Sequence, residues 1–550
     1  VGGVGTTISL LVGGGCEYAG VAGHRPLRRI ADPVVAAAPA GVRVRTRIHP
    51  SADEAVALTA IGDLLGSMYR SELAARIGLG RLGPQGRVRW RAKRKQALTA
   101  VSSSRWAGAI TRAVDDQILL GMRGLVAQVA DLRAAIEVLE VRCALRPGQL
   151  VPAADGDEEP AGRGRSRRVR GYRSAAERFA KTRRLAVLKA RLAAAEAALA
   201  AGRPSITVGG KRLWRTRNHL DAADMTEPQW RARWNAARMF LTADGESGKP
   251  GGNETIRVDE HGHLRVKVPA ALAERFGTHL TVAAPVAFHH RGTEWAGRVQ
   301  HRRAVRYDIS HDPDRDRWYL DASWKTAPET VPGIDQLRDG PVLGVDLNAA
   351  HLACCVLDAS GNPIGEPVTV AVQTSGLRAS RRDGRIRMAI TALLDLAAQH
   401  NCTAVVVENL DFAGARATGR ETLGRGGRGK RLRSIVAGIP TARFRNRLVG
   451  MATRRGIGVI GVDPAYTSRW GTQHWRTPLQ QQTSDPATVT GHHGAAVAIG
   501  RRGLGVAIRR RPVGPRTRQR TGVGTPPARP EHPPRTTRRC RSSGSPPRPP

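Results

Sequence analysis

Two acidic side chains occupy positions where an acid is costly unless a partner binds it. Asp346 lies inside the apolar run Pro341-Val-Leu-Gly-Val-Asp-Leu-Asn, and Glu408 ends the apolar run Thr403-Ala-Val-Val-Val-Glu. Both runs are typical of β-strands, and a buried carboxylate needs a counter-charge or a metal ion. Two such acids on strands of one sheet, with a third ligand, would hold divalent cations that activate water against a phosphodiester. The alternative is that each acid is salt-bridged to one of the many arginines.

The composition favours a polyanionic partner. The 550 residues include 88 basic and 46 acidic side chains, giving a net charge of +42, and the basic residues are 79 arginines and nine lysines. The planar guanidinium group suits phosphates and stacked bases, so this bias agrees with nucleic-acid binding. GC-rich coding is the competing explanation, because it also enriches Arg, Ala, Gly and Pro. The six cysteines form no CxxC pair, which favours a reducing cytoplasm. No apolar stretch reaches about 18 residues, so we expect no membrane span.

The elements that must position the two acids form a multidomain α+β protein. We expect a poorly ordered segment at 1–45, a helical lobe at 46–204, a β-rich domain at 205–330, an α/β domain at 331–510 and a disordered Pro/Arg-rich tail at 511–550. The opening residues have no basic region of the kind that precedes a signal peptide. Neither end of the chain is established as native sequence by its pattern.

A heptad-like seam predicts a long helix in the helical lobe. Apolar residues step by four and three without a break: Ile118, Met122, Leu125, Val129, Leu132, Ile136 and Leu139. A second helix should begin at Ser174, with Glu177 three residues later in capping-box spacing. Its leucines form one stripe, so we expect the two helices to pair as an antiparallel hairpin. The basic loop between them would contact phosphate or remain solvated.

Alternating apolar residues between about 254 and 328 predict a small antiparallel sheet or barrel. Basic, histidine and aromatic residues are interleaved with these strands, and Arg291, Arg302 and Arg303 are the candidates for contact with a nucleic-acid backbone. A solvated sheet face would account for them nearly as well. Beyond the α/β pattern, Arg501 and Arg502 begin a further basic run that would either contact a backbone or remain solvated.

Three ordered motifs resemble those of a known family. Gly344-Val-Asp-Leu-Asn with His351 resembles the first RuvC motif of TnpB proteins and type V CRISPR effectors, and Val407-Glu408-Asn-Leu resembles the second. Val462-Asp-Pro-Ala-Tyr-Thr-Ser468 resembles the segment that precedes the family's zinc ribbon. The resemblance covers roughly 335–510. It implies an RNase H-like (RuvC) nuclease domain, a wedge domain with an OB-like barrel at about 205–326, and a helical recognition lobe.

The chain departs from the family at two places. The family's zinc ribbon needs four cysteines, whereas Gly471 and His474 stand at the first pair, so we predict no structural zinc and expect Trp470 and Trp475 to fill that volume. In the third motif, His492 stands where the resemblance implies a catalytic aspartate. Imidazole ligates Mg²⁺ less well than a carboxylate does, so this metal site should be weakened, with Asp463 as a stand-in candidate.

The resemblance and the charge together imply an insertion-sequence-encoded, RNA-guided DNA-binding protein of bacterial origin, associated with the nucleoid. A guide RNA and double-stranded DNA would be its partners, Asp346, Glu408 and His492 its catalytic and metal-binding residues, and Mg²⁺ or Mn²⁺ its cofactor. Cleavage would be retained, weakened or lost. The alternatives are a guided DNA-binding repressor without nuclease activity and a transposase or accessory protein of an insertion sequence.

Overall fold

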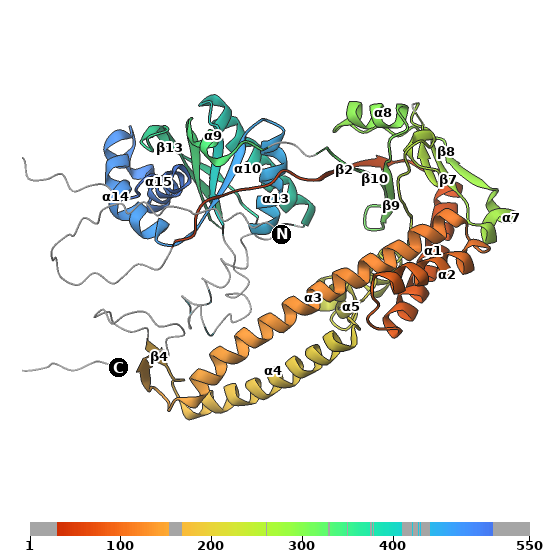
Figure 1. Ribbon diagram of the computed structural model, residues 1–550, viewed down its shortest axis with the longest axis horizontal. Coiled ribbons are helices and arrows are strands. Elements are labelled where there is room, and N and C mark those ends of the chain that lie inside the picture. Colours follow the sequence, from red (N-terminus) through yellow and green to blue (C-terminus); the bar gives the residue numbers. More distant parts are fainter. Residues whose placement is uncertain are drawn as a thin grey trace, which may run out of the picture. The chain divides into compact units, whose positions relative to one another are not determined.

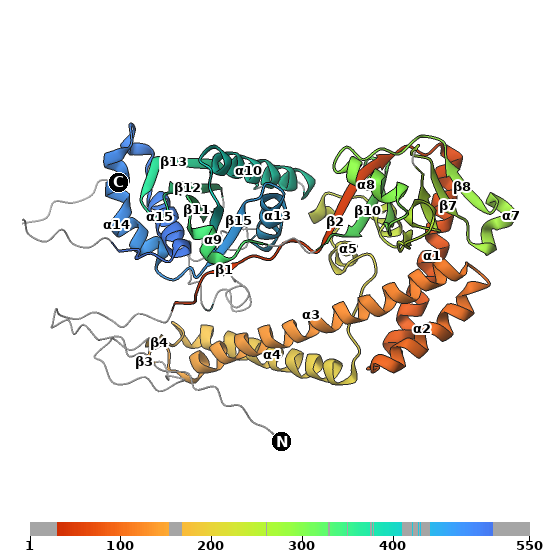
Figure 2. The same ribbon diagram turned by 45° about the horizontal axis from the view of Figure 1, so that its top comes forward.

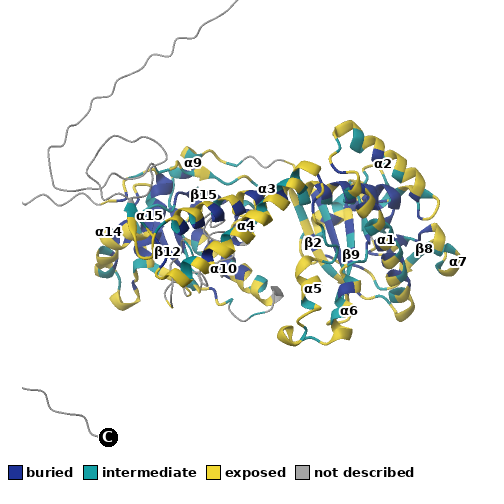
Figure 3. Ribbon diagram, turned by 90° about the horizontal axis from the view of Figure 1, so that it is seen from below, coloured by how far each residue is buried: buried dark blue, intermediate teal, exposed yellow. Residues whose placement is uncertain are grey.

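The structure is a computed structural model (Figure 1). It describes residues 30–509, except 153–167, 260, 328–330, 349, 375–376, 378, 410–420, 422–426, 428–429 and 431–440. The tail expected at 511–550 lies outside the described residues, as does the first part of the basic loop expected before Ser174. Buried residues are concentrated in the strands and on the inner faces of the helices (Figure 3).

The helical region consists of α1 (Ala52–Gly78), α2 (Pro84–Thr99), α3 (Ser104–Ala144) and α4 (Ala175–Ala201). The predicted hairpin is confirmed: the C-terminal part of α3 packs along α4 through the predicted seam. Ion pairs Arg133–Glu196 and Glu140–Lys189 show that the two helices are antiparallel. The Ser174 hydroxyl accepts a hydrogen bond from the Glu177 amide at 3.1 Å, as the capping pattern predicted. A short ribbon, β3 (Leu150–Pro152) with β4 (Arg168–Arg170), follows the tip of this hairpin.

The β-rich region contains two antiparallel sheets among its described strands, rather than one closed barrel. One sheet has the order β2-β10-β9-β5: Gly41–Ile48, Arg317–Lys325, Arg306–Asp312 and Thr242–Ala243. The other has the order β6-β7-β8: Ile256–Val258, Leu264–Lys267 and His279–Val282. Short helices lie between the strands: α5 (Lys211–Thr216), α6 (Glu227–Ala236), α7 (Ala273–Phe276) and α8 (Gly292–Gln300). Trp106 of α3 and Tyr307 of β9 belong to one hydrophobic core, so the first helices fold together with these sheets.

Residues 30–45 differ from the expectation of poor order for 1–45, and residues 1–29 lie outside the described residues. Val34–Val35 (β1) pairs with β15, and β2 pairs along its whole length with β10. The alternation of Val42, Val44 and Ile48 with arginines explains β2, because it gives the strand one apolar and one basic face. Both strands lie among Gly, Ala and Pro residues, so neither was recognised in the sequence.

The α/β region contains a sheet with the order β1-β15-β14-β11-β12-β13. Its strands are β11 (Val342–Leu347), β12 (His351–Leu357), β13 (Pro363–Ala371), β14 (Ala404–Glu408) and β15 (Gly458–Val462). The strands β11, β12 and β13 are joined antiparallel, whereas β14 and β15 run parallel to β11. The bounds of β11 and β14 agree within a few residues with the two apolar runs that the sequence predicted to be strands.

Helices cover the two faces of this sheet (Figure 2). On one face, α10 (Ala379–Gln399) and α13 (Thr441–Thr453) pack against odd-numbered residues such as Val345 and Val407. On the other face, α14 (Thr467–Gln482) and α15 (Gly491–Leu504) pack against even-numbered residues such as Val342 and Val406, together with α9 (Ile334–Arg338). The nearly continuous apolar runs of β11 and β14 follow from this burial on both faces.

Candidate active site

The alternation of side chains between the two faces of a β-strand places Asp346 and Glu408 on the same face of the sheet. In the parallel pair β11–β14, Val345 stands opposite Val407, so the next residues on the two strands are the two acids. Both have even numbers, and the even-numbered residues of these strands face α15. The two carboxylates therefore lie at the C-terminal ends of adjacent strands on the α15 side, as the sequence predicted.

Glycines allow α15 to lie close to β11. A Cβ atom on Gly344 would stand 2.2 Å from the carbonyl oxygen of Ala496, and one on Gly500 would stand 2.3 Å from Cδ1 of Leu357. Any larger side chain would push the helix away from the strand. The close approach brings the first turn of α15 to the end of β11, where Asp346 is located.

His492 meets Asp346 in that first turn. The Thr490 hydroxyl caps the helix by accepting a hydrogen bond from the His492 amide at 3.3 Å. The His492 imidazole then lies with Nδ1 2.8 Å from Oδ2 of Asp346, a distance at which Nδ1–H donates to the carboxylate. This hydrogen bond raises the pKa of His492, while partial burial lowers it. The bond fixes the tautomer and leaves the Nε2 atom available to another partner.

Glu408 has a different environment from Asp346. Burial raises the pKa of Glu408 to about 7, the Thr467 hydroxyl opposes this by donating a hydrogen bond to Oε1, and the negative charge of Asp346 raises it further. Within the described residues, no arginine forms an ion pair with either acid. Among the described residues, the charge of Arg502 lowers the pKa of Glu408 without a direct ion pair, and the interpretation that both acids are salt-bridged to arginines finds no support there. From the sequence, Thr467 was only part of the motif at 462–468, and its hydrogen bond to Glu408 was not predicted.

Two more histidines surround His492. The rings of His351 and His492 stand edge to face with centroids 5.2 Å apart, and burial lowers the pKa of His351. His493 is buried, accepts a hydrogen bond from the Thr490 amide at Nδ1 (3.1 Å), and contacts the Thr369 hydroxyl through Nε2 at 2.9 Å. His493 therefore holds the start of α15 in place, whereas His351 and His492 face the acids.

Two of the three candidate ligands, Asp346 and Glu408, suit a divalent cation such as Mg²⁺, and the third, His492, suits it less well. Asp346 and Glu408 offer hard oxygen atoms, and a cation between them would remove the repulsion that contributes to the raised pKa of Glu408. The third position holds the His492 imidazole, which is hydrogen-bonded to Asp346. In the described part of the chain, no three His, Cys, Asp or Glu side chains are gathered so that they could hold a metal ion.

Asp463, the stand-in candidate for the third acid, is engaged with the backbone. Its Oδ1 accepts a hydrogen bond from the Ala465 amide at 2.8 Å, and its Oδ2 accepts one from the Ala31 amide at 3.0 Å. These contacts order the turn after β15 and the segment before β1. Asp463 therefore holds local structure at this edge of the sheet.

Trp470 and Trp475 lie in α14, where the resemblance implies a zinc ribbon. Both are buried, as expected, and the Trp475 indole donates a hydrogen bond to the Ile508 carbonyl at 2.8 Å. Gly471 allows α14 to cross α15 closely, because a Cβ there would stand 2.4 Å from the Gly494 carbonyl oxygen. The volume around α14 is thus filled by apolar packing. The absence of zinc stays a prediction.

The five arginines predicted to contact nucleic acid differ in placement. Arg302 and Arg303 are exposed. Arg291 forms an ion pair with Glu294. Arg501 donates to the carbonyls of Ala507 and Gly361, and Arg502 is buried and donates to the Asp463 carbonyl. Arg501 and Arg502 therefore stabilise the end of α15, and the basic surface expected there does not include them.

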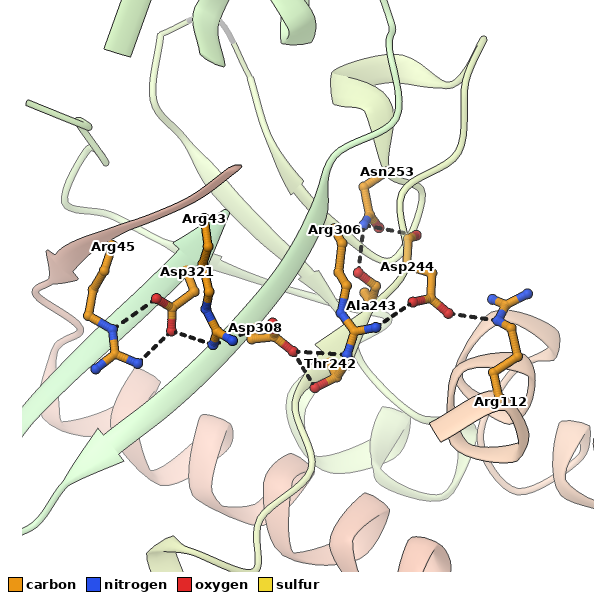
Figure 4. A network of polar contacts seen from close by, with 10 residues as sticks. All are labelled: Arg43, Arg45, Arg112, Thr242, Ala243, Asp244, Asn253, Arg306, Asp308 and Asp321. Atoms are coloured by element: carbon orange, nitrogen blue, oxygen red, sulfur yellow. Dashed lines mark hydrogen bonds and ion pairs between the residues drawn. The ribbon is translucent and has the colours of Figure 1, made fainter. Parts of the chain in front are cut away.

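A second group of buried acids lies on the β2-β10-β9-β5 sheet (Figure 4). Asp321 accepts two hydrogen bonds from Arg45, at 2.9 and 2.6 Å, and one from Arg43 at 3.0 Å. Burial alone would raise the pKa of Asp321, but these guanidinium groups hold it below its usual value. Asp308, opposite Asp321 on β9, accepts a hydrogen bond from Thr242. These acids organise basic side chains along one sheet face.

Comparison with known proteins gives distant structural similarity alone. No family model matches the chain, and no curated protein matches it. The solved structure of T. thermophilus RuvC in complex with Holliday junction substrate matches 30% of this chain and 91% of that chain, with 18% identity and a TM-score of 0.21. Among the described helices, none is both long and apolar enough to cross a membrane. The function proposed for this chain therefore rests on its own residues.

Proposed function

We propose that this chain is a TnpB-like, RNA-guided DNA-binding protein whose RuvC-like site cleaves DNA weakly and prefers Mn²⁺ to Mg²⁺. The observation that carries the proposal is the pair Asp346 and Glu408. These carboxylates are adjacent on one face of the sheet, and neither forms an ion pair with an arginine among the residues that the structure describes.

The strand order supports the RNase H-like assignment. Three antiparallel strands, β13-β12-β11, are followed by the parallel strands β14 and β15. This is the arrangement that the resemblance to RuvC domains implies, with the first acid on the central strand β11 and the second on its parallel neighbour β14.

Asp346 and Glu408 would hold a divalent cation between them. A bound cation supplies charge neutralisation at the phosphate and lowers the pKa of water. The raised pKa of Glu408 means that this side chain must release a proton near neutral pH before it can serve as a ligand. His492 cannot supply a third carboxylate oxygen, and a nitrogen donor suits Mn²⁺ better than Mg²⁺.

The charge of the chain supports nucleic-acid partners. A net charge of +42 exceeds what solubility requires and would neutralise many backbone phosphates. In the proposed complex, base pairing with the guide RNA reads the DNA sequence, and the protein recognises backbone shape and a short adjacent motif.

A guided DNA binder without cleavage is the second candidate. The hydrogen bond between His492 and Asp346 favours it, because it occupies one oxygen of the first acid. This candidate predicts that Asp346→Ala leaves repression of a matched site unchanged.

The test is cleavage of a plasmid library by the full chain co-expressed with its flanking RNA, in Mg²⁺ and in Mn²⁺. We expect cuts beside a fixed short motif. Asp346→Ala should abolish these cuts. Asp335→Ala, which changes an exposed acid of the same region, should retain them. Protection of matched sites without cuts would favour the second candidate. Absence of co-purified RNA, with binding indifferent to added RNA, would exclude both.

A further inference from the structure

A strongly basic hollow lies beside α5, away from the paired acids. Its lining includes Lys211, Arg212, Arg215, Thr216 and His219, and its volume is about 530 Å³. The residues of α5 are mostly exposed, and Figure 3 shows α5 next to α6 with exposed residues on both. Four of these five side chains carry a positive charge or can gain one.

These cations are placed together at an energetic cost. Lys211 and Arg215 stand one helical turn apart on α5, with Arg212 three residues before Arg215. Like charges at this spacing destabilise a helix. In the described part of the chain, no acid forms an ion pair with any of the three. A helix of six residues gains too little from its own hydrogen bonds to offset this repulsion.

Tryptophan packing holds the helix in place. The ring of Trp214 on α5 lies against Trp234 on α6 with centroids 5.2 Å apart, and Trp230 stacks on Trp234 at 5.8 Å. The Trp230 indole also donates a hydrogen bond to the Leu213 carbonyl at 2.8 Å. Gly209, at φ +92°, permits this approach, since a Cβ there would stand 2.7 Å from the Trp234 ring. The packing of the three tryptophans therefore holds α5 in place despite the repulsion between its basic side chains.

One more cation borders this group. The Arg217 guanidinium lies 3.4 Å from the centroid of the Trp214 ring, a stacked cation–π contact that restricts its motion. A guanidinium group held flat against an indole keeps its edge available for a bidentate bond to a phosphate.

We propose that this hollow, formed by Lys211, Arg212, Arg215 and His219, binds the phosphodiester backbone of a nucleic acid. Several exposed cations gathered on one short helix suit an anionic ligand, and a backbone presents phosphates at a spacing that they can follow. The choice of a nucleic acid as the ligand rests on the proposed function. The hollow and its charge are independent of that function.

The test is fluorescence anisotropy of labelled 20-nucleotide RNA and DNA strands with the full chain, over a series of salt concentrations. The variant K211Q/R212Q/R215Q should weaken binding on the order of tenfold or more near 0.15 M salt. It should also reduce the slope of log affinity against log salt by about 2, since each phosphate contact on a single strand contributes about 0.7. A larger loss for one of the two strands identifies RNA or DNA as the source of the backbone.

The matched control is R183Q/R184Q/R191Q, which removes the same charge from exposed positions on α4. Equal losses of affinity and slope in the two triple variants would overturn the proposal, because net charge alone would then account for binding. Thermal unfolding checks the fold, and K211Q/R212Q/R215Q should be at least as stable as the parent protein because it lacks the repulsion on α5. Guided cleavage by the parent protein is tested separately on the plasmid library, so a failed nuclease and a failed hollow give different results.

Discussion

Asp321 in the β-rich region and Glu408 in the α/β region are both acids on β-strands, yet their surroundings differ. Asp321 receives three hydrogen bonds from Arg43 and Arg45, and its pKa is held below the usual value. Glu408 receives one from a threonine hydroxyl, and its pKa is raised to about 7. Asp321 has its counter-charges in direct hydrogen-bond contact, whereas no arginine of the described residues bonds to Glu408, and only the charge of Arg502 lowers its pKa from farther away.

The difference separates acids that hold structure from acids that are available for chemistry. Glu72, like Asp321, is buried and forms an ion pair with an arginine. Among the described residues, no arginine forms an ion pair with Asp346 or Glu408. An acid with a strongly raised pKa, such as Glu408, is typical of a functional site.

The largest expected effect is on cleavage. Asp346→Ala should reduce cleavage by at least about 100-fold, because one of the two oxygen-donor positions is lost. His492→Asp should raise Mg²⁺-dependent cleavage on the order of tenfold, because it replaces the imidazole by a carboxylate. Plasmid linearisation over time measures both. If His492→Asp lowers cleavage in Mg²⁺ and in Mn²⁺ alike, the imidazole is itself required and the third position is not weakened.

The second effect is on stability, with opposite signs in the two regions. Asp321→Asn should lower the free energy of unfolding by about 1–3 kcal/mol, because hydrogen bonds to charged groups are lost from a buried site. Glu408→Gln should leave stability unchanged or raise it, because it removes a buried acid that has no arginine partner. Urea unfolding of metal-free protein measures both. Destabilisation by Glu408→Gln equal to that by Asp321→Asn would remove the distinction between the two acids.

The third effect is a pH dependence confined to Glu408. Its folded-state pKa of about 7 lies above the ordinary value of 4.5, so between these values the folded protein retains a proton that the unfolded chain has released. Stability from this residue is therefore lost as the pH rises from about 4.5 to about 7. Glu408→Gln and the parent protein should melt alike near pH 4.5, and the variant should melt higher above pH 7. A constant difference across this range, measured in chelator, would contradict the prediction.

The smallest effect concerns the two arginines that bind Asp321. Arg45 makes two hydrogen bonds to Asp321 and Arg43 makes one, and both side chains are more than half exposed. Arg45→Gln should therefore cost more than Arg43→Gln, with each below about 1.5 kcal/mol because solvent screens the charges. Thermal melts at low and high salt would show the difference. Equal costs would indicate that Asp321 needs only the net positive charge around it.

Local patterns predicted the elements better than they predicted side-chain partners. The seam from Ile118 to Leu139 predicted the long helix, and the apolar runs around Asp346 and Glu408 predicted two strands of one sheet. Once the parallel pairing of the two strands is known, the alternation of side chains along them places Asp346 and Glu408 side by side. The sequence did not reveal that Arg501 and Arg502 turn inward, because helix-end arginines look alike whether they bind backbone carbonyls or solvent.

Long-range pairing accounts for most of what the sequence did not reveal. The two-residue strand β1 carries no periodic signal and exists only because the edge of β15 accepts it. The contact of Glu408 with Thr467 joins residues 59 positions apart, and the contact of Asp346 with His492 joins residues 146 apart. The close approach of Gly344 to α15 was equally invisible, since nothing near a glycine in sequence shows what will lie against it.

The strands β1 and β2 also have a consequence for the order of events during synthesis. β2 needs β10, and β1 needs β15, whose pairing residue Gly461 stands more than 420 positions later. At about 5–20 residues per second, the ribosome needs roughly 20–85 seconds to make the chain between them. Throughout that time β1 is unpaired, whereas β2 can pair once β10 has been made, and when β15 emerges its outer edge stays open until β1 returns to it. An open edge of this kind invites pairing with other chains, so this short segment protects the nascent sheet from aggregation as its last step of assembly.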